Sequence, residues 1–155
     1  MHDRHVVFNT FVKALILLGV FIALTYIESA TPLVRPQSFI AFIVVLAFVV
    51  SDAFLFSFFA LVAVWWEKYV SFFQIEYIVL VLMAVVVFLL MRFIIFRRTF
   101  SICALVIGAL CALWWVSLGF WDSVFSLPFL LEVLYTVVAG ALLFLTTLWT
   151  RNESV

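Results

Sequence analysis

Four stretches of the chain are apolar for about twenty residues each, the length that a helix needs to cross ~30 Å of hydrocarbon. They run from Phe8 to Ile27, Tyr77 to Phe96, Phe100 to Phe120 and Pro128 to Trp149. Inside a bilayer every backbone amide must be satisfied within the spanning segment itself. Each stretch is therefore predicted to form a transmembrane helix.

A further apolar tract, from Ser38 to Trp66, is broken by Ser51 and Asp52. As one helix its roughly 29 residues would measure ~43 Å and overshoot the bilayer. Divided at the break it predicts two short helices, over 38–50 and 53–66, each ~20 Å long. Two arrangements stay open. The pair crosses the membrane twice with Asp52 in a hydrated turn, which we favour, or it forms a re-entrant hairpin that buries Asp52.

The amino-acid composition indicates that the chain is surrounded by lipid rather than by water. Of the 155 residues 70% are hydrophobic and 10% charged, against ~45–50% and ~25% in ordinary soluble domains. So few charges cannot coat a water-soluble body of this size. Two cysteines exclude a disulfide scaffold, and zero net charge offers no basic surface for nucleic acid. The predicted fold is all-α: a polytopic integral membrane bundle of about six segments, two of them short, in a single domain over 1–155.

Basic residues predict the orientation because Lys and Arg accumulate in cytoplasmic loops. Six segments with the N-terminus inside put six basic residues on the inner side and two, Arg35 and Lys68, outside. A model with five segments places at best five basic residues on the inner side and three on the outer side. The stronger bias therefore predicts six segments with cytoplasmic termini. Aromatic residues expected near the outer boundary agree: Tyr26, Trp65, Trp66, Tyr69, Tyr77 and Trp121. The first segment also resembles a signal peptide, but its length and the segments that follow favour a retained helix.

Small residues mark the expected helix contacts, since helices in lipid associate by close packing. Ala104, Gly108 and Ala112 recur at every fourth residue and form one ridge, and Thr136 and Gly140 form a shorter one. Internal packing is the favoured interpretation of these ridges, and a docking face for a partner is the alternative. Phe58 and Phe59, in a phenylalanine-rich stretch, are candidate lipid-facing or partner-binding residues.

Ionisable residues in or beside the segments are candidate functional charges, because a charge in hydrocarbon is costly. Glu132 lies one turn inside the last helix, where a carboxylate reaching outer water is favoured over an interior partner or a cation path. Together with Asp52 it could form a proton path. The remaining candidates lie at the boundaries, one outer and three inner: Glu67, Arg92, Arg97 and Arg98.

Catalytic and metal chemistry have little support. Cys103 and Cys111 lie about 80° apart around one helix, with no CxxC spacing and no histidine beside them. His2 and His5 belong to a terminal tail, and no glycine-rich phosphate loop is present. We therefore predict no catalytic residue, metal site or cofactor, and a protein that is not an enzyme.

Several local motifs accompany this order of segments. Tyr26-Ile27-Glu28-Ser29 ends the first helix, and Arg35-Pro36-Gln37-Ser38 opens the next apolar run. The break at Ser51-Asp52 follows, then a short span ending in Glu67, then an arginine-bearing inner end from Arg92 to Arg98. In its segment order and in these motifs the chain resembles the MreD family of rod shape-determining proteins. Where that family carries glycines in its third segment, this chain has Phe58, Phe59 and Ala60.

The resemblance implies a non-enzymatic scaffold of the cell-elongation machinery in the bacterial inner membrane. It implies MreC as partner, with MreB, RodA and the elongation transpeptidase nearby. The family fold is similar to the substrate-binding subunits of energy-coupling-factor transporters, so a small transporter or solute-binding subunit is the alternative. A transporter should enclose a polar cavity near Glu76 and Glu132, whereas a scaffold should be filled inside and expose an apolar groove.

Overall fold

The computed structural model describes residues 2–30, 37–68, 74–93, 100–117, 119–120 and 126–152. These residues form six α-helices and no strand, so the all-α prediction is confirmed. The helices are α1 (His2–Ala30), α2 (Ser38–Val49), α3 (Ala53–Lys68), α4 (Gln74–Phe93), α5 (Phe100–Ser117) and α6 (Leu127–Asn152). Each covers most of one apolar stretch in the sequence.

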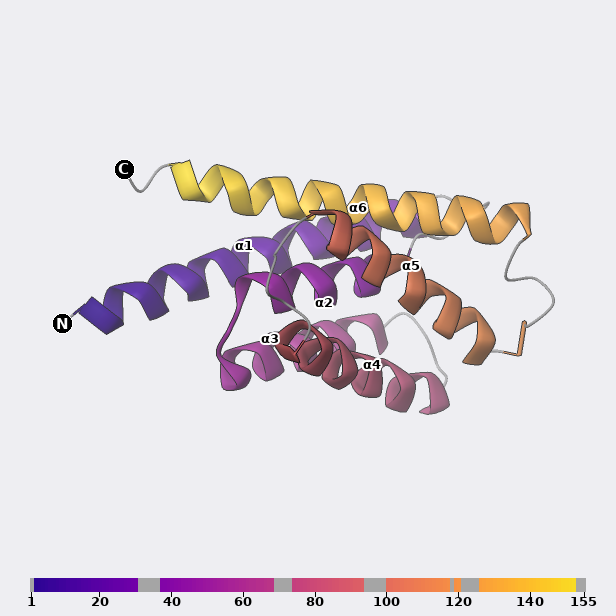
Figure 1. The fold of residues 1–155 in the computed structure, drawn as a ribbon, viewed down its shortest axis with the longest axis horizontal. Helices are drawn as coiled ribbons and strands as arrows, with labels where there is room; N and C mark the ends of the chain where they lie inside the picture. The colour runs from indigo at the N-terminus through magenta and orange to yellow at the C-terminus, as the bar shows by residue number, and fades with distance from the viewer. Residues whose placement is uncertain are drawn as a thin grey trace.

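Successive helices run in alternating directions along the bundle (Figure 1). The start of α1 and the end of α6 consequently lie at the same end. Two hydrogen bonds at the opposite end of the bundle agree with these directions. One joins Ser38, at the start of α2, to Glu28, near the end of α1, and the other joins Trp115, near the end of α5, to Glu132, near the start of α6.

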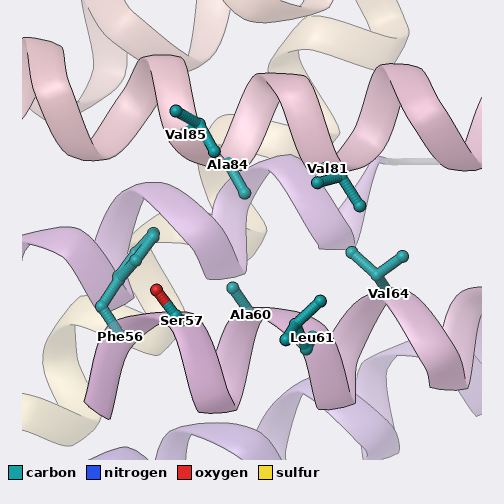
Figure 2. Close-up of a pocket in the computed structure, with 8 residues that line it drawn as sticks. All are labelled: Phe56, Ser57, Ala60, Leu61, Val64, Val81, Ala84 and Val85. Carbon is teal, nitrogen blue, oxygen red and sulfur yellow. The ribbon is translucent and has the colours of Figure 1, made fainter. Parts of the chain in front are cut away.

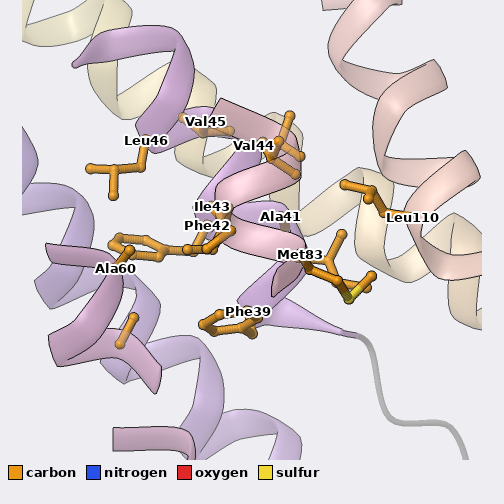
Figure 3. Packing of buried hydrophobic residues seen from close by; sticks show 14 of the residues in the cluster. Phe39, Ala41, Phe42, Ile43, Val44, Val45, Leu46, Ala60, Met83 and Leu110 are labelled. Carbon is orange, nitrogen blue, oxygen red and sulfur yellow. The ribbon is translucent and has the colours of Figure 1, made fainter. Parts of the chain in front are cut away.

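The short helix α2 is the centre of the bundle, because it contacts all five other helices. Its residues from Ser38 to Leu46 are all buried, whichever side of the helix they occupy. A helix that is apolar all round is expected in such a position. Figure 3 shows its side chains packed among Ala60 of α3, Met83 of α4 and Leu110 of α5. At twelve residues α2 is only ~18 Å long, and neighbouring helices surround it.

The break between α2 and α3 is a turn with Asp52 at its surface. The Val50 N–H donates to the Leu46 carbonyl at 2.8 Å and closes α2. Asp52 is exposed, and its Oδ1 accepts a hydrogen bond from the Leu55 N–H at 2.8 Å, so its side chain caps α3. Asp52 is therefore an exposed turn residue and is not buried within the bundle.

Phenylalanines supply much of the interior. Phe21 of α1 stacks on Phe42 of α2, and Phe56 of α3 stacks on Phe88 of α4, each with ring centroids 4.7 Å apart. The phenylalanine-rich stretch of α3 is therefore divided between core and surface, since Phe56 is buried and Phe54 is 83% exposed.

Two helices are long and apolar enough to cross a membrane, over Val7–Ser29 in α1 and Leu127–Thr147 in α6. The core helix of a soluble protein would be mostly buried, but only 17% and 33% of these two segments are buried. Their outward faces carry large apolar side chains such as Phe8 and Leu134. Length and exposed apolar surface together support a location in a membrane.

Candidate functional site

Buried polar side chains converge on the N-terminus of α2. The Gln37 N–H donates to Oγ1 of Thr136, on α6, at 3.0 Å. The Ser38 N–H donates to Oε1 of Glu28, on α1, at 3.1 Å, and the Ser38 hydroxyl donates to the same carboxylate oxygen. Gln37 itself makes no side-chain cap. Two neighbouring helices thus supply the capping acceptors that α2 lacks in its own sequence.

The same hydrogen bonds continue through α6 to α5. The Thr136 hydroxyl donates to the Glu132 backbone carbonyl at 2.7 Å. The indole Nε1 of Trp115 donates to Oε2 of Glu132 at 2.8 Å. These residues connect α1, α2, α6 and α5, and we refer to them as the polar chain: Glu28, Gln37, Ser38, Thr136, Glu132 and Trp115.

The residues at the centre of the polar chain are almost completely shielded from solvent. Thr136 is fully buried, and Ser38 and Glu132 are 1% and 8% exposed. The sequence favoured a Glu132 carboxylate that reaches the outer water, but in the structure this side chain lies inside the bundle. Its Oε2 is occupied by Trp115, whereas its Oε1 is buried without a hydrogen-bond partner. The carboxylate of Glu28 lies at the positive end of the α2 dipole, which favours a negative group there.

The physical need for the polar chain follows from where α2 begins. The first N–H groups of a helix have no partner within the helix. Leaving such a group unsatisfied away from water costs several kcal/mol. Because α2 starts inside the protein, the N–H of its first residue, Ser38, depends on Glu28, and the N–H of the preceding Gln37 depends on Thr136, rather than on water. The arrangement fixes the start of the central helix.

A second link lies at the same end of the bundle. The indole Nε1 of Trp66, on α3, donates to Oγ1 of Thr25, on α1, at 3.0 Å. The Thr25 hydroxyl in turn donates to the Ile22 carbonyl. Tyr26 contacts the same indole edge-on, with ring centroids 6.0 Å apart. Trp66 therefore joins α3 to α1, in addition to any role at the membrane boundary.

The predicted ridge of Ala104, Gly108 and Ala112 is half-buried on α5. A Cβ added to Gly108 would lie 3.9 Å from Cγ1 of Val133, on α6. At this position the ridge therefore faces another helix of the same chain, which agrees with the internal-packing interpretation.

The two candidate phenylalanines of α3 differ. Phe59 is buried and packs near Phe11 of α1, with ring centroids 5.7 Å apart, so the idea that it binds a partner is wrong. Phe58 is 51% exposed and remains available at the surface.

The candidate charges are not brought together. Asp52 follows the C-terminus of α2, whereas Glu132 belongs to the polar chain at its N-terminus, ~18 Å away along that helix. The buried residues between them on α2 are apolar from Phe39 to Leu46, so α2 offers no polar path between the two carboxylates. Glu67 is half-buried in the last turn of α3, and Arg92 is exposed in the last turn of α4. Arg97, Arg98 and the Glu76 side chain lie outside the described residues.

A groove opens between α3 and α4 (Figure 2). Its volume is about 170 Å³. The lining is apolar except for one hydroxyl, and comprises Phe56, Ser57, Ala60, Leu61, Val64, Val81, Ala84 and Val85. We refer to it as the α3–α4 groove.

Metal and thiol chemistry find no assembled site. Within the part of the chain that the structure describes, no three His, Cys, Asp or Glu side chains gather to hold a metal ion. Cys103 and Cys111 are free thiols, and both are buried.

Sequence reasoning missed most of the polar chain. Glu28 was noted only within the motif that ends the first helix, and Trp115 was not among the candidate residues. Only the spacing of Thr136 and Gly140 pointed to a helix contact. A carboxylate two residues before the end of α1, with Ser38 opening the next helix, was the available signal.

Comparison of the chain with protein-family models, curated proteins and solved structures finds no match. The resemblance described above therefore rests on sequence pattern.

Proposed function

We propose that the chain is an integral membrane scaffold whose six helices all cross the bilayer, with both termini on the cytoplasmic side. Support comes from the alternating helix directions and from the apolar faces of α1 and α6. The four shorter helices cross as one body with these two, because the central α2 contacts every other helix.

One observation carries the scaffold proposal: the buried polar side chains of the bundle form hydrogen bonds that join one helix to another. Glu28 and Thr136 cap α2, and Trp115 occupies an oxygen of Glu132. The centre is filled by apolar side chains of α2. A subunit built in this way positions other proteins rather than performing chemistry.

The role that we propose is that of an MreD-like subunit of the bacterial cell-elongation machinery, in the inner membrane. The sequence motifs around Glu28, Arg35 and Asp52 support it, and by the same resemblance the partner is an MreC-like protein. MreB, RodA and the elongation transpeptidase would act in the same complex.

The alternative, a solute-binding membrane subunit, is favoured by one feature. Oε1 of Glu132 is buried with no hydrogen-bond partner, as expected of a carboxylate that receives a ligand. A thermal-shift screen of the detergent-solubilised protein against water-soluble vitamins tests it. Stabilisation by one compound, lost in Glu132→Leu, would establish the alternative.

Co-expression tests the scaffold role. Tagged chain and an MreC-like protein from the same genome are expected to co-purify from detergent extracts, whereas an unrelated six-span protein does not retain the MreC-like protein. Deletion of the gene is expected to round a rod-shaped host. Failure of co-purification together with normal cell shape would refute the role.

Topology is tested separately by labelling with a membrane-impermeant maleimide in intact cells. Phe120→Cys, at an exposed position, is expected to react from outside. Ser51→Cys and Asn152→Cys are expected to react only after the membrane is opened. The native cysteines are buried, so the unmodified protein is the background control.

A further inference from the structure

We propose that Glu132 is a proton-binding site. Its side chain is held inside the bundle as a neutral carboxylic acid, with the proton on Oε1 and with Oε2 as the carbonyl oxygen. The inference goes beyond the scaffold role and beyond the solute-binding alternative, because it concerns the purified chain with no other protein and no solute bound.

The surroundings of Glu132 provide little for an ionised carboxylate. A carboxylate only accepts hydrogen bonds, and its two oxygens offer about four positions for donors. Among the described residues one donor fills one of these positions, the Trp115 indole at Oε2. The Thr136 hydroxyl donates instead to the backbone carbonyl of Glu132. Oε1 is buried with no hydrogen-bond partner. A charge buried in this way is costly, and such a group commonly becomes neutral instead.

The helices packed against Glu132 contribute no compensating positive charge within the described part of the chain. Helices α5, α2 and α1 pack against α6. The group that faces the carboxyl from α5 is the Cys111 thiol, and from α2 it is the uncharged amide of Gln37. Helix α1 supplies Glu28 at the start of α2. On α6 itself Tyr135 is half exposed. The titratable groups in this set are neutral or negative, and a nearby negative charge favours a protonated carboxyl.

A neutral acid fits the same surroundings. Protonation makes Oε1 a hydroxyl donor, so this atom needs one acceptor rather than several donors. The Gln37 side-chain amide faces the carboxyl without forming a hydrogen bond to Oε1. Its carbonyl oxygen can accept from the hydroxyl after a rotation of the side chain. Oε2 remains an acceptor and keeps the bond from the Trp115 indole.

The second carboxyl of the polar chain is suited to carry the charge. Oε1 of Glu28 receives both the N–H and the hydroxyl of Ser38. Glu28 is only half-buried, and it lies at the positive end of the α2 dipole, which stabilises a negative group. Two carboxyls whose environments differ in this way take different protonation states. We therefore assign the charge to Glu28 and the proton to Glu132.

Infrared spectroscopy detects the acid directly, because a protonated carboxyl has a C=O stretching band that a carboxylate lacks. The purified full chain is reconstituted at neutral pH in phosphatidylethanolamine–phosphatidylglycerol vesicles. The wild type is expected to show an acid band that shifts in heavy water, and Glu132→Gln is expected to lose this component. Asp52→Asn makes the same acid-to-amide change at an exposed position and is expected to leave the band unchanged.

Two further variants keep the test decisive if Glu132→Gln fails to fold. Trp115→Phe removes the hydrogen bond to Oε2, and a carbonyl without such a bond vibrates at higher frequency. The acid band is therefore expected to persist in Trp115→Phe and to move to higher frequency. Glu28→Gln is expected to retain the band, since Glu28 is the ionised carboxyl. A purely structural role for Trp115 would not move the frequency of a carboxyl band.

The pH dependence of stability is a second measurement. A carboxyl that holds its proton more tightly in the folded state than in the unfolded state stabilises the fold most at low pH. This stabilisation is lost as the pH rises, because the unfolded chain then gives up the proton more readily. The SDS concentration that unfolds the wild type is expected to fall from mildly acidic to mildly alkaline pH. Glu132→Gln is expected to show a smaller fall, and Asp52→Asn the same fall as the wild type.

A wild type with no acid band at neutral pH would overturn the proposal, as would a band that Glu132→Gln does not remove or that Trp115→Phe does not shift. The measurements use neither an MreC-like protein nor a vitamin. Their failure therefore leaves the scaffold role and the solute-binding alternative standing, and failure of co-purification leaves the proton site standing.

Discussion

Trp115 and Glu132 hold the end of α5 against the start of α6 through a single hydrogen bond of 2.8 Å from the indole Nε1 to Oε2. Two rings, Phe120 and Phe129, pack against the Trp115 indole, each with ring centroids 5.6 Å from it. The carboxylate has no other hydrogen-bond donor at its second oxygen, which is buried. The hydrogen bonding of Oε2 across α5 and α6 therefore depends on the Trp115 indole.

Replacing that donor tests the dependence. Trp115→Phe is expected to lower the free energy of unfolding by about 1–3 kcal/mol, the usual cost of leaving a buried polar group without its partner. Unfolding of the detergent-solubilised protein by added SDS measures the change. Trp114→Phe is the control. It makes the same change from indole to phenyl at a neighbouring buried position, 8% exposed, and so measures the effect of the smaller ring alone.

A double-mutant cycle separates the bond from the packing around it. Glu132→Leu removes the carboxylate, so Trp115→Phe in that background leaves no buried oxygen unpaired. The double variant is expected to be more stable than the sum of the single effects by about 0.5–3 kcal/mol. Additive losses would show that the Trp115 bond contributes little.

Thr136 has a comparable role for the central helix, because its hydroxyl accepts from the Gln37 N–H. Thr136→Val keeps the shape but removes the acceptor, and a loss of about 1–3 kcal/mol is expected. Hydrogen exchange at the Gln37 amide is expected to accelerate as well. Thr146→Val is the matched control, since the Thr146 hydroxyl donates only to the Leu143 carbonyl of its own helix. Equal losses in the two variants would contradict the capping role.

The helices could be predicted from the sequence because the length of an apolar run and a break such as Ser51-Asp52 act locally. Asp52 caps α3, the helix that begins beside it, because it accepts a hydrogen bond from the N–H of Leu55, only three residues later in the chain. Pattern and structure agree wherever partners lie within one turn.

The polar chain could not be predicted, because its partners are far apart in the sequence. Gln37 and Thr136 are separated by 99 residues, and no periodicity within either helix indicates which neighbour faces it. Burial of Glu132 likewise depends on α5 lying beside α6. Spacing identifies residues that share a side of a helix, but not the helix that covers that side.

Asp52 offers a test of the turn. Asp52→Ala removes the side-chain acceptor for the Leu55 N–H and is expected to cost about 0.5–2 kcal/mol, as lost helix caps do. Asp52→Ser retains an acceptor and is expected to recover most of the loss in the same SDS titration. Since Asp52 does not face Glu132, neither variant is expected to alter the effect of Trp115→Phe. A large coupling between these sites would contradict the separation that the structure shows.

Gly140, rather than Gly108, is the close contact between helices. A Cβ at Gly140 would lie 2.7 Å from Cδ1 of Ile107 and 3.8 Å from Cβ of Ala41, so α6 meets α5 and α2 there. Gly140→Ala is expected to be less stable than Gly108→Ala by about 1–3 kcal/mol, because overpacking displaces a buried neighbour.

Gly108→Ala itself is expected to be neutral or slightly stabilising, because its Cβ meets only ordinary contact and alanine favours the helix by about 0.5–1 kcal/mol. The decisive variant is Ile107→Val, which removes the Cδ1 atom. In that background Gly140→Ala is expected to lose most of its penalty, since the crowding atom is gone. A penalty that persists would mean that the Ile107 Cδ1 atom does not limit how closely these helices approach.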